Sequence, residues 1–188
     1  NERNAMKRTI VSKWVTSILL AITITLGANA SAYMKIDGID GEAVDKDHKG
    51  WSDIMTFEQG LRKQVASTGG KKGKRPSTAS WSNVIVTKEL DKSSPKMALA
   101  VASGRVIPWV VLDVTASLEE GGEIAYYRYE LKNVQVTSYK VGGTHENMLP
   151  VESFSLNFEE IKVTYNSLDP NHGGRVSYGW DLVNNQPN

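Results

Sequence analysis

One strictly alternating stretch indicates the fold: Tyr126-Tyr127-Arg128-Tyr129-Glu130-Leu131-Lys132-Asn133. Tyr127, Tyr129, Leu131 and Asn133 share one parity, and they alternate with Tyr126, Arg128, Glu130 and Lys132. Successive side chains of a strand point to opposite faces, so this spacing predicts a β-strand with one buried side and one wet side. The preceding Gly121-Gly122 suits a hairpin turn into that strand.

Short segments of this kind, separated by turn residues, run through most of the chain, a pattern typical of a sandwich or barrel. We expect strands over residues 33–38, 50–60, 81–88, 106–117, 123–138, 150–165 and 174–183. The sixth changes parity: one set is Phe154, Leu156 and Phe158, and the other is Ile161, Val163 and Tyr165. A bulge at Glu159-Glu160 would restore a single apolar face.

One helix interrupts the strands. Ser94 fits an N-cap, Pro95 the first helical position and Gly104 the C-terminal cap, around an alanine-rich run from Lys96 to Ser103. The sequence therefore predicts a mainly β domain, a compact antiparallel barrel or sandwich with one short α-helix.

The first 32 residues read as a targeting leader ahead of a domain over residues 33–188. Lys7, Arg8 and Lys13 precede an uncharged stretch over residues 14–27, followed by Ala28-Asn29-Ala30 and Ala30-Ser31-Ala32. This is the pattern of a Sec-type signal peptide cleaved after Ala30 or Ala32. A membrane anchor is the alternative, but the uncharged run is shorter than the roughly 20 apolar residues of a spanning helix. Residues 1–5 precede Met6, which fits an initiator methionine, so we expect them not to belong to the natural chain.

Composition narrows the function of the domain. Residues 33–188 are enough for one domain with its own core, and they carry 18 basic against 20 acidic residues, a net charge of −2. That balance argues against general nucleic-acid binding, which needs a positive footprint. The chain has no cysteine, so disulfides, thiol nucleophiles and thiolate metal sites are excluded.

Two charged segments stand out. The run Ala66–Ser80 has no apolar periodicity, which predicts a long exposed loop that is either functional or a solvated tip. Its basic residues are Lys71, Lys72, Lys74 and Arg75. The second segment follows the first strand and carries Asp37, Asp40, Glu42, Asp45 and Asp47. A polar turn between strands explains these acids, with a weak cation site as the alternative.

Neither segment fits a ligand motif. A Walker A loop ending at Gly73-Lys74 needs glycine at position 68 and a hydroxyl at position 75, where Thr68 and Arg75 stand. An EF-hand loop begun at Asp45 would place Lys49 at a ligand position and Thr56 at the bidentate glutamate.

Catalytic motifs are equally incomplete. His145-Glu146 begins like a zincin helix, but Leu149 occupies the place of the second histidine. His48, His145 and His172 all fall in polar turns, which indicates surface histidines rather than a metal triad, and no Gly-x-Ser-x-Gly elbow is present. We therefore expect no enzymatic activity, no catalytic residue, no cofactor and no metal.

Several blocks taken together resemble the Hcp family, the tube protein and secreted component of bacterial type VI secretion systems. They are Lys35–Glu42 with Asp47–Trp51, Leu90–Pro95, Ser103–Pro108, Tyr126–Val134, Glu152–Phe158 and Gly179–Leu182. Each block is weak alone, but their order around one helix is fairly specific.

The resemblance implies a barrel-like domain that assembles into a six-membered ring, rings that stack into a tube, and a lumen that carries effectors. The partners it implies are other copies of the chain, type VI secretion components and effectors, with no nucleic acid and no stable membrane anchor. Under this hypothesis the basic loop, Lys71 to Arg75, contacts the acidic turn of a neighbouring ring.

The leader departs from the family, whose members ordinarily start near the position of Tyr33 without one. An exported relative acting as a periplasmic or extracellular binding module is therefore the alternative function, and a small hydrolase is a residual third. The expected location is secreted or extracellular, by way of the periplasm, with a cytoplasmic pool if the leader is not used.

Overall fold

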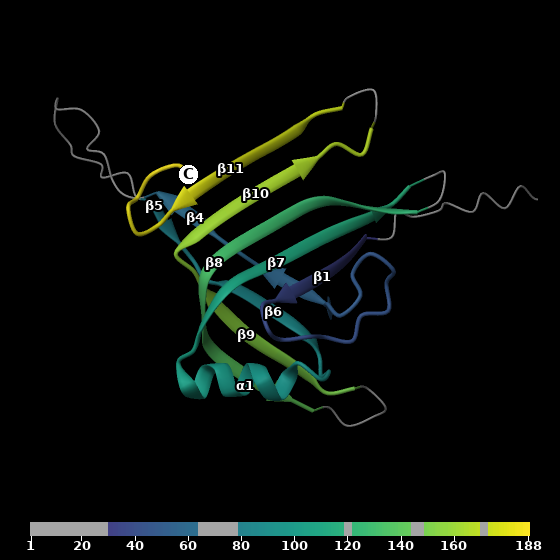
Figure 1. The fold of residues 1–188 in the computed structure, drawn as a ribbon, viewed down its shortest axis with the longest axis vertical. Helices are drawn as coiled ribbons and strands as arrows, with labels where there is room; N and C mark the ends of the chain where they lie inside the picture. Colours follow the sequence, from purple (N-terminus) through teal and green to yellow (C-terminus); the bar gives the residue numbers. More distant parts are fainter. Residues whose placement is uncertain (1–29, 64–78, 119–121, 144–148, 170–172) are drawn as a thin grey trace, which may run out of the picture.

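A computed structural model describes residues 30–63, 79–118, 122–143, 149–169 and 173–188 (Figure 1). These residues form eleven strands and one helix. The elements are β1 Ala30–Ile36, β2 Ser52–Ile54, β3 Thr56–Glu58, β4 Leu61–Lys63, β5 Ala79–Trp81, β6 Val84–Glu89, α1 Ser94–Ser103, β7 Val106–Ser117, β8 Glu123–Gly142, β9 Val151–Asn157, β10 Glu160–Asn166 and β11 Arg175–Asp181. The predicted antiparallel β-barrel or sandwich with one short helix is confirmed.

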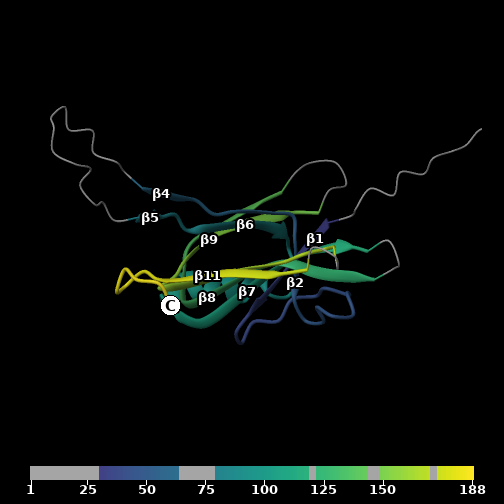
Figure 2. The same cartoon turned by 90° about the horizontal axis from the view of Figure 1, so that it is seen from above.

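Nine strands form one sheet that folds into two layers. Its order is β2-β1-β7-β8-β9-β6-β3, with β10 paired to β8 and β11, and β4–β5 forms a separate two-stranded sheet. Figure 2 shows β6 and β9 in one layer and β7, β8 and β11 in the other. The short segment 52–58 pairs with β1 through β2 and with β6 through β3, so it borders both ends of the sheet. The result is a barrel-like sandwich.

The strand predicted over 50–60 is therefore wrong as a single element. β2 and β3 belong to opposite ends of the sheet, and the chain turns between them at Met55, whose backbone N–H donates to the Thr87 carbonyl at 2.9 Å. β4 then pairs with β5 in the second sheet.

The predicted bulge at Glu159-Glu160 marks a real break, but it separates two strands. β9 ends at Asn157 and pairs with β6 and β8, whereas β10 begins at Glu160 and pairs with β8 and β11. Both parity sets reach the same core, because Phe154, Leu156 and Phe158 are buried with Ile161 and Val163. Tyr165, in contrast, is exposed.

β8 changes layers at the same level as this break. Asn133 has φ 49°, a left-handed conformation that asparagine tolerates better than most residues. Its side-chain amide donates to Glu159 Oε2 at 2.7 Å and ties the corner to the break opposite. Parity shifts here as well, since Leu131 is followed by Val134 and Val136 as the next buried residues.

The first half of β8 is not split into a buried and a wet side as predicted. Residues 123–130 are all half-buried, on both faces. On the expected wet face, the Arg128 guanidinium donates two 2.6 Å hydrogen bonds to Asp113 of β7, and the Tyr126 ring meets Tyr165 edge-on. Cross-strand pairs therefore cover the polar side.

The helix is confirmed with its start shifted by one residue. Ser93, not Ser94, is the N-cap, and Pro95 lies in the first turn. Gly104 has φ 64° and caps the C-terminus, and its N–H donates toward the Ala100 and Val101 carbonyls. The Ser94 hydroxyl instead accepts from the Asp91 N–H at 3.0 Å, so the turn before the helix uses the side chain expected at the cap.

A buried charge cluster lies where β6, β9 and the start of α1 meet. Lys88 Nζ contacts Asp91 Oδ1 at 2.7 Å and Glu152 Oε1 at 2.9 Å, and both Lys88 and Glu152 are 0% exposed. Tyr139 donates to the second Glu152 oxygen at 2.7 Å, and Ser52 of β2 donates to Asp91 at 2.8 Å. The cluster joins four strands and the helix start through charged hydrogen bonds.

Candidate functional site

The acidic segment forms a loop, residues 37–51, that is fastened to the sheet rather than projecting freely. Backbone hydrogen bonds run from Asp37 N–H to the Trp109 carbonyl, from Gly41 N–H to Gly50, and from Ala43 N–H to Trp51. Gly50 has φ 78°, which favours glycine at this turn. The loop is therefore a fixed surface feature.

His48 is the internal anchor of this acidic loop, and the prediction that it is a surface histidine is wrong. It is 5% exposed, its ring stacks on Tyr33 at 4.2 Å, and Trp51 meets it edge-on. Nδ1 lies 2.5 Å from Asp45 Oδ1, and Nε2 lies 3.3 Å from Asp113 Oδ2. Both ring nitrogens face carboxylates, so neither is free to activate a nucleophile. His145 and His172 lie outside the described residues.

The five predicted acids split into inward and outward groups. Asp45 turns inward, and its hydrogen bond with His48 lowers the pKa of the Asp45 carboxyl. Asp40 is exposed, but Lys35 Nζ contacts it at 2.6 Å and lowers its pKa. Glu42 accepts from the Lys92 N–H at 3.1 Å. The exposed acidic surface therefore consists of Asp40, Glu42 and Asp47, while Asp37 is half-buried.

The basic residues Lys71, Lys72, Lys74 and Arg75 lie outside the described residues. The strands that lead to and from them are described: β4 pairs with β5 in antiparallel register, Leu61 opposite Trp81. Arg62 and Lys63 on β4 are exposed. The described base of this hairpin therefore carries exposed positive charge.

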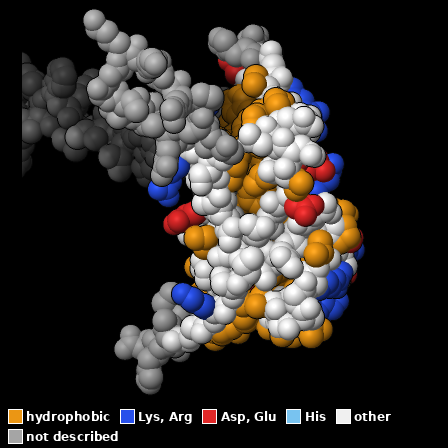
Figure 3. Space-filling model, turned by 90° about the vertical axis from the view of Figure 1, so that its left-hand side faces the viewer, with side chains coloured by type: hydrophobic (Ala, Val, Ile, Leu, Met, Phe, Trp, Pro, Cys, Tyr) orange, Lys and Arg blue, Asp and Glu red, His pale blue; other side chains and the backbone are white. Residues whose placement is uncertain are grey.

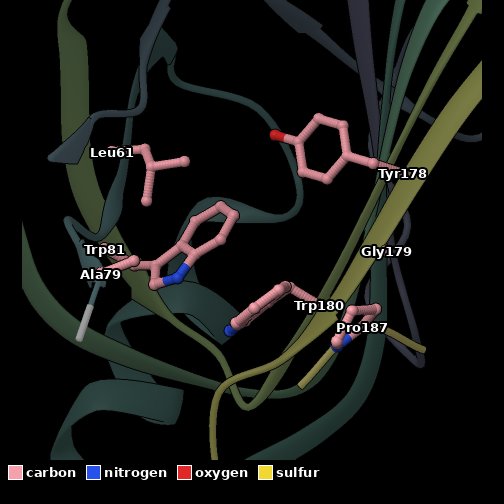
Figure 4. A pocket seen from close by; sticks show the side chains of 7 residues that line it. All are labelled: Leu61, Ala79, Trp81, Tyr178, Gly179, Trp180 and Pro187. Atoms are coloured by element: carbon pink, nitrogen blue, oxygen red, sulfur yellow. The ribbon is translucent and has the colours of Figure 1, made fainter. Parts of the chain in front are cut away.

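An apolar cleft, which the sequence did not reveal, lies between the β4–β5 hairpin and β11 (Figure 4). It encloses about 330 Å³, and hydrophobic side chains gather on this side of the molecule (Figure 3). Its walls are Leu61, Ala79, Trp81, Tyr178, Gly179, Trp180 and Pro187. The Trp81 and Tyr178 rings face each other across it, 6.3 Å apart, and burial raises the pKa of the Tyr178 phenol.

Two hydrogen-bond donors in the cleft walls have no acceptor among the described residues. They are the indole N–H groups of Trp81 and Trp180, both buried. A buried donor without an acceptor costs free energy, so these two groups lower the stability of the cleft walls. The signal in the sequence was weak, because Trp81 and Trp180 are nearly 100 positions apart and only the fold brings them together.

The cleft continues into an open sheet edge. Among the described strands, β11 pairs only with β10. The chain end covers part of its other edge, where Asp181 and Gln186 exchange backbone hydrogen bonds and the Asn188 N–H donates to the Gly179 carbonyl. Val176 and Tyr178, on the same face as the cleft, are 69% and 46% exposed. An uncovered strand edge of this kind invites another chain.

The described residues hold no cluster of three His, Asp or Glu side chains able to bind a metal ion. The most buried ionisable groups, Lys88 and Glu152, are paired with each other. No helix within the described ranges is long and apolar enough to cross a membrane.

An antiparallel barrel-like sandwich with one short helix and an open strand edge defines the structural class, a mainly β domain. The chain is a member of the Hcp family: the family model described as "Type VI secretion system effector, Hcp" matches residues 33–165.

Individual relatives agree with this assignment. The chain is 30% identical to protein hcp1 of Pseudomonas aeruginosa over 158 residues, which cover 81% of this chain and 95% of that protein. A solved structure titled as a type six secretion system protein is 29% identical, has a TM-score of 0.78, and is matched over 85% of this chain and 100% of its own. Hcp1 from Salmonella typhimurium, 24% identical, shares the fold with a TM-score of 0.71 over 85% of this chain and 99% of its own.

Proposed function

We propose that this chain is a structural, non-enzymatic subunit that forms rings in the tube of a type VI secretion system, is secreted with it and carries effectors. Family membership and the relatives named above support the secretion role. Six copies in a ring, and stacking of rings into a tube, are the finer parts of the proposal.

The open edge of β11 beside the aromatic cleft is the observation that carries ring formation. Val176 and Tyr178 of this strand are exposed. A ring of identical head-to-tail contacts would cover this edge in every subunit, leaving no open end.

The test places a charge on this edge. Val176→Asp adds a carboxylate to an exposed position, so the subunit itself should stay folded while the contact is lost. Leu99→Asp is the matched control, since Leu99 is 65% exposed on α1, far from β11 (Figure 1). Light scattering on the full chain should show about six subunits for wild type and Leu99→Asp, and smaller species for Val176→Asp. An unchanged mass for Val176→Asp would contradict the role of the edge.

Stacking is assigned to the two charged segments. The β4–β5 base and the acidic loop lie on opposite sides of the molecule (Figures 1 and 2), as head-to-tail contact between rings requires. The acidic partners are the outward-facing Asp40, Glu42 and Asp47, because Asp45 is engaged by His48. The basic partners are Lys71, Lys72, Lys74 and Arg75.

Reversing the four basic charges to glutamate should leave rings intact and shorten or abolish tubes. The control carries Lys96→Glu and Lys140→Glu, two exposed lysines outside both segments. Electron microscopy of both variants at equal concentration measures the length of the tubes that they form. Tubes of normal length from the fourfold variant would reject the stacking hypothesis.

The second candidate is an exported binding module outside the tube, which the Sec-like leader over residues 1–32 favours. Cell fractionation in a strain without a type VI system separates the two. Protein that reaches the periplasm there with its leader removed supports the binding module, and full-length protein held in the cytoplasm supports the tube subunit.

A further inference from the structure

The first strand of the domain includes residues that the sequence assigns to leader processing. β1 begins at Ala30, and its first three residues pair with β7: Ala30 with Ala116, Ser31 with Thr115 and Ala32 with Val114. Both Ala-x-Ala patterns therefore end inside a folded strand.

The two candidate cleavage bonds differ in how deeply they lie in the sheet. Ala32 and Tyr33 are paired on both edges, since β2 contributes Ile54 opposite Ala32 and Asp53 opposite Tyr33. Tyr33 is 8% exposed beneath the His48 ring. The Ala30–Ser31 bond is paired on the β7 edge, and the Thr115 hydroxyl donates to the Ser31 carbonyl at 3.4 Å.

We propose that folding and leader removal exclude each other in this chain, because β1 contains the processing site. A peptidase binds its substrate as an extended strand with free backbone groups. Here β7 pairs with the strand at both candidate bonds, and β2 pairs with it at Ala32–Tyr33 as well. Cleavage then needs the chain to be unfolded, or needs β1 to detach. The inference rests on the leader being a signal peptide, as the exported alternative assumes.

Each order of events has a structural consequence. A chain that folds first keeps residues 1–29 covalently joined to β1. A chain cut first after Ala32 loses three of the seven β1 residues and their pairs with β7. It also loses part of the wall of a 290 Å³ pocket lined by Ala30, Ser31, Ala32, Asp53, Ile54, Met55 and Val114. The order of folding and cleavage therefore sets which form of the protein exists.

The experiment compares a folded and an unfolded full chain under identical conditions. Val86 and Phe154 are fully buried and lie far from the leader in the sequence. Val86→Asp and, separately, Phe154→Asp should therefore unfold the domain without altering the amino-acid sequence of residues 1–60. Circular dichroism verifies the unfolding. Each chain is incubated with purified bacterial signal peptidase in detergent micelles, and intact mass is followed with time.

We expect both unfolded variants to lose residues 1–30 or 1–32 at least tenfold faster than the folded wild type. Equal rates would overturn the proposal, because β1 would give no protection. No cleavage of any chain would also overturn it, because the motif would not be a processing site. Neither failure touches ring assembly, since the mass of the uncut wild-type ring is measured separately.

Discussion

The buried contact between Lys88 and Glu152 gives the most quantitative prediction. Lys88→Met keeps most of the side-chain volume but removes the ammonium that contacts Glu152 and Asp91. Glu152, itself 0% exposed, would retain only the Tyr139 hydroxyl as a hydrogen-bond donor among the described residues. The variant thus leaves a carboxylate buried without its cation.

The expected cost follows from that uncompensated charge. Removing one partner of a buried ion pair destabilises a protein by about 3–5 kcal/mol. For a domain of this size each kcal/mol lowers the melting temperature by about 2–4 °C, so a fall of roughly 6–20 °C is expected. Urea unfolding of the full chain, followed by tryptophan fluorescence, measures the free energy directly.

Two further variants decide whether charge is the cause. Lys88→Met with Glu152→Gln removes both charges and should recover at least half of the loss, because the buried carboxylate is gone. Lys140→Met changes an exposed lysine on β8 and should stay within about 0.5 kcal/mol of wild type. A loss below about 1 kcal/mol for Lys88→Met, or no recovery in the double variant, would mean that the buried charge of Glu152 does not depend on Lys88.

Asp91 of the same cluster makes the stability of the fold depend on pH in the acid range. Burial opposes ionisation of Asp91, but hydrogen bonds from Lys88, Ser93 and Ser52 outweigh it and lower the pKa of this carboxyl below the usual 3.8. A carboxyl with a depressed folded-state pKa stabilises the fold above its unfolded pKa, and this stability is lost as the pH falls through the folded value. Lys88→Met should therefore unfold in acid at a higher pH than wild type.

Two other substitutions test the acidic loop and the β8 corner. His48→Ala removes the contacts with Asp45 and Asp113 and the stack on Tyr33, and should lower the free energy of unfolding in urea by about 1–3 kcal/mol. Lys49→Ala, at the exposed neighbouring position, should lower it by less than about 0.5 kcal/mol. Equal effects would mean that His48 does not anchor the loop. Asn133→Ala places alanine at φ 49° and removes the hydrogen bond to Glu159, and should lower the free energy of unfolding by about 1–2 kcal/mol. Asn133→Gly loses the same hydrogen bond but tolerates that φ, so it should lower the free energy of unfolding by less. The reverse order would exclude backbone strain as the cause.

The sequence predicted those elements whose signals are local. The helix has an alanine-rich run between a proline and a left-handed glycine, so its span was found to within one residue at the start. The strand predicted over 106–117 matches β7, and the strand predicted over 123–138 lies within β8. The resemblance to the Hcp family rested on blocks in a fixed order, and the family match confirms it.

The elements that were missed depend on contacts distant in sequence. Residues 52–58 form two strands because the first part pairs with β1 and the last part pairs with β6. His48 lies inside the fold, where its Nε2 contacts the carboxylate of Asp113, 65 positions away in the sequence. The cleft joins Trp81 of one sheet to Trp180 of another, and neither residue has a periodic neighbour that marks it as a wall.

Assembly of this domain into closed rings is the central proposal. Electron microscopy of the purified full chain, with class averages of end-on views, tests that claim most directly. We expect rings with sixfold symmetry whose subunits meet at the β11 edge. Single subunits only, or open chains that never close, would contradict it.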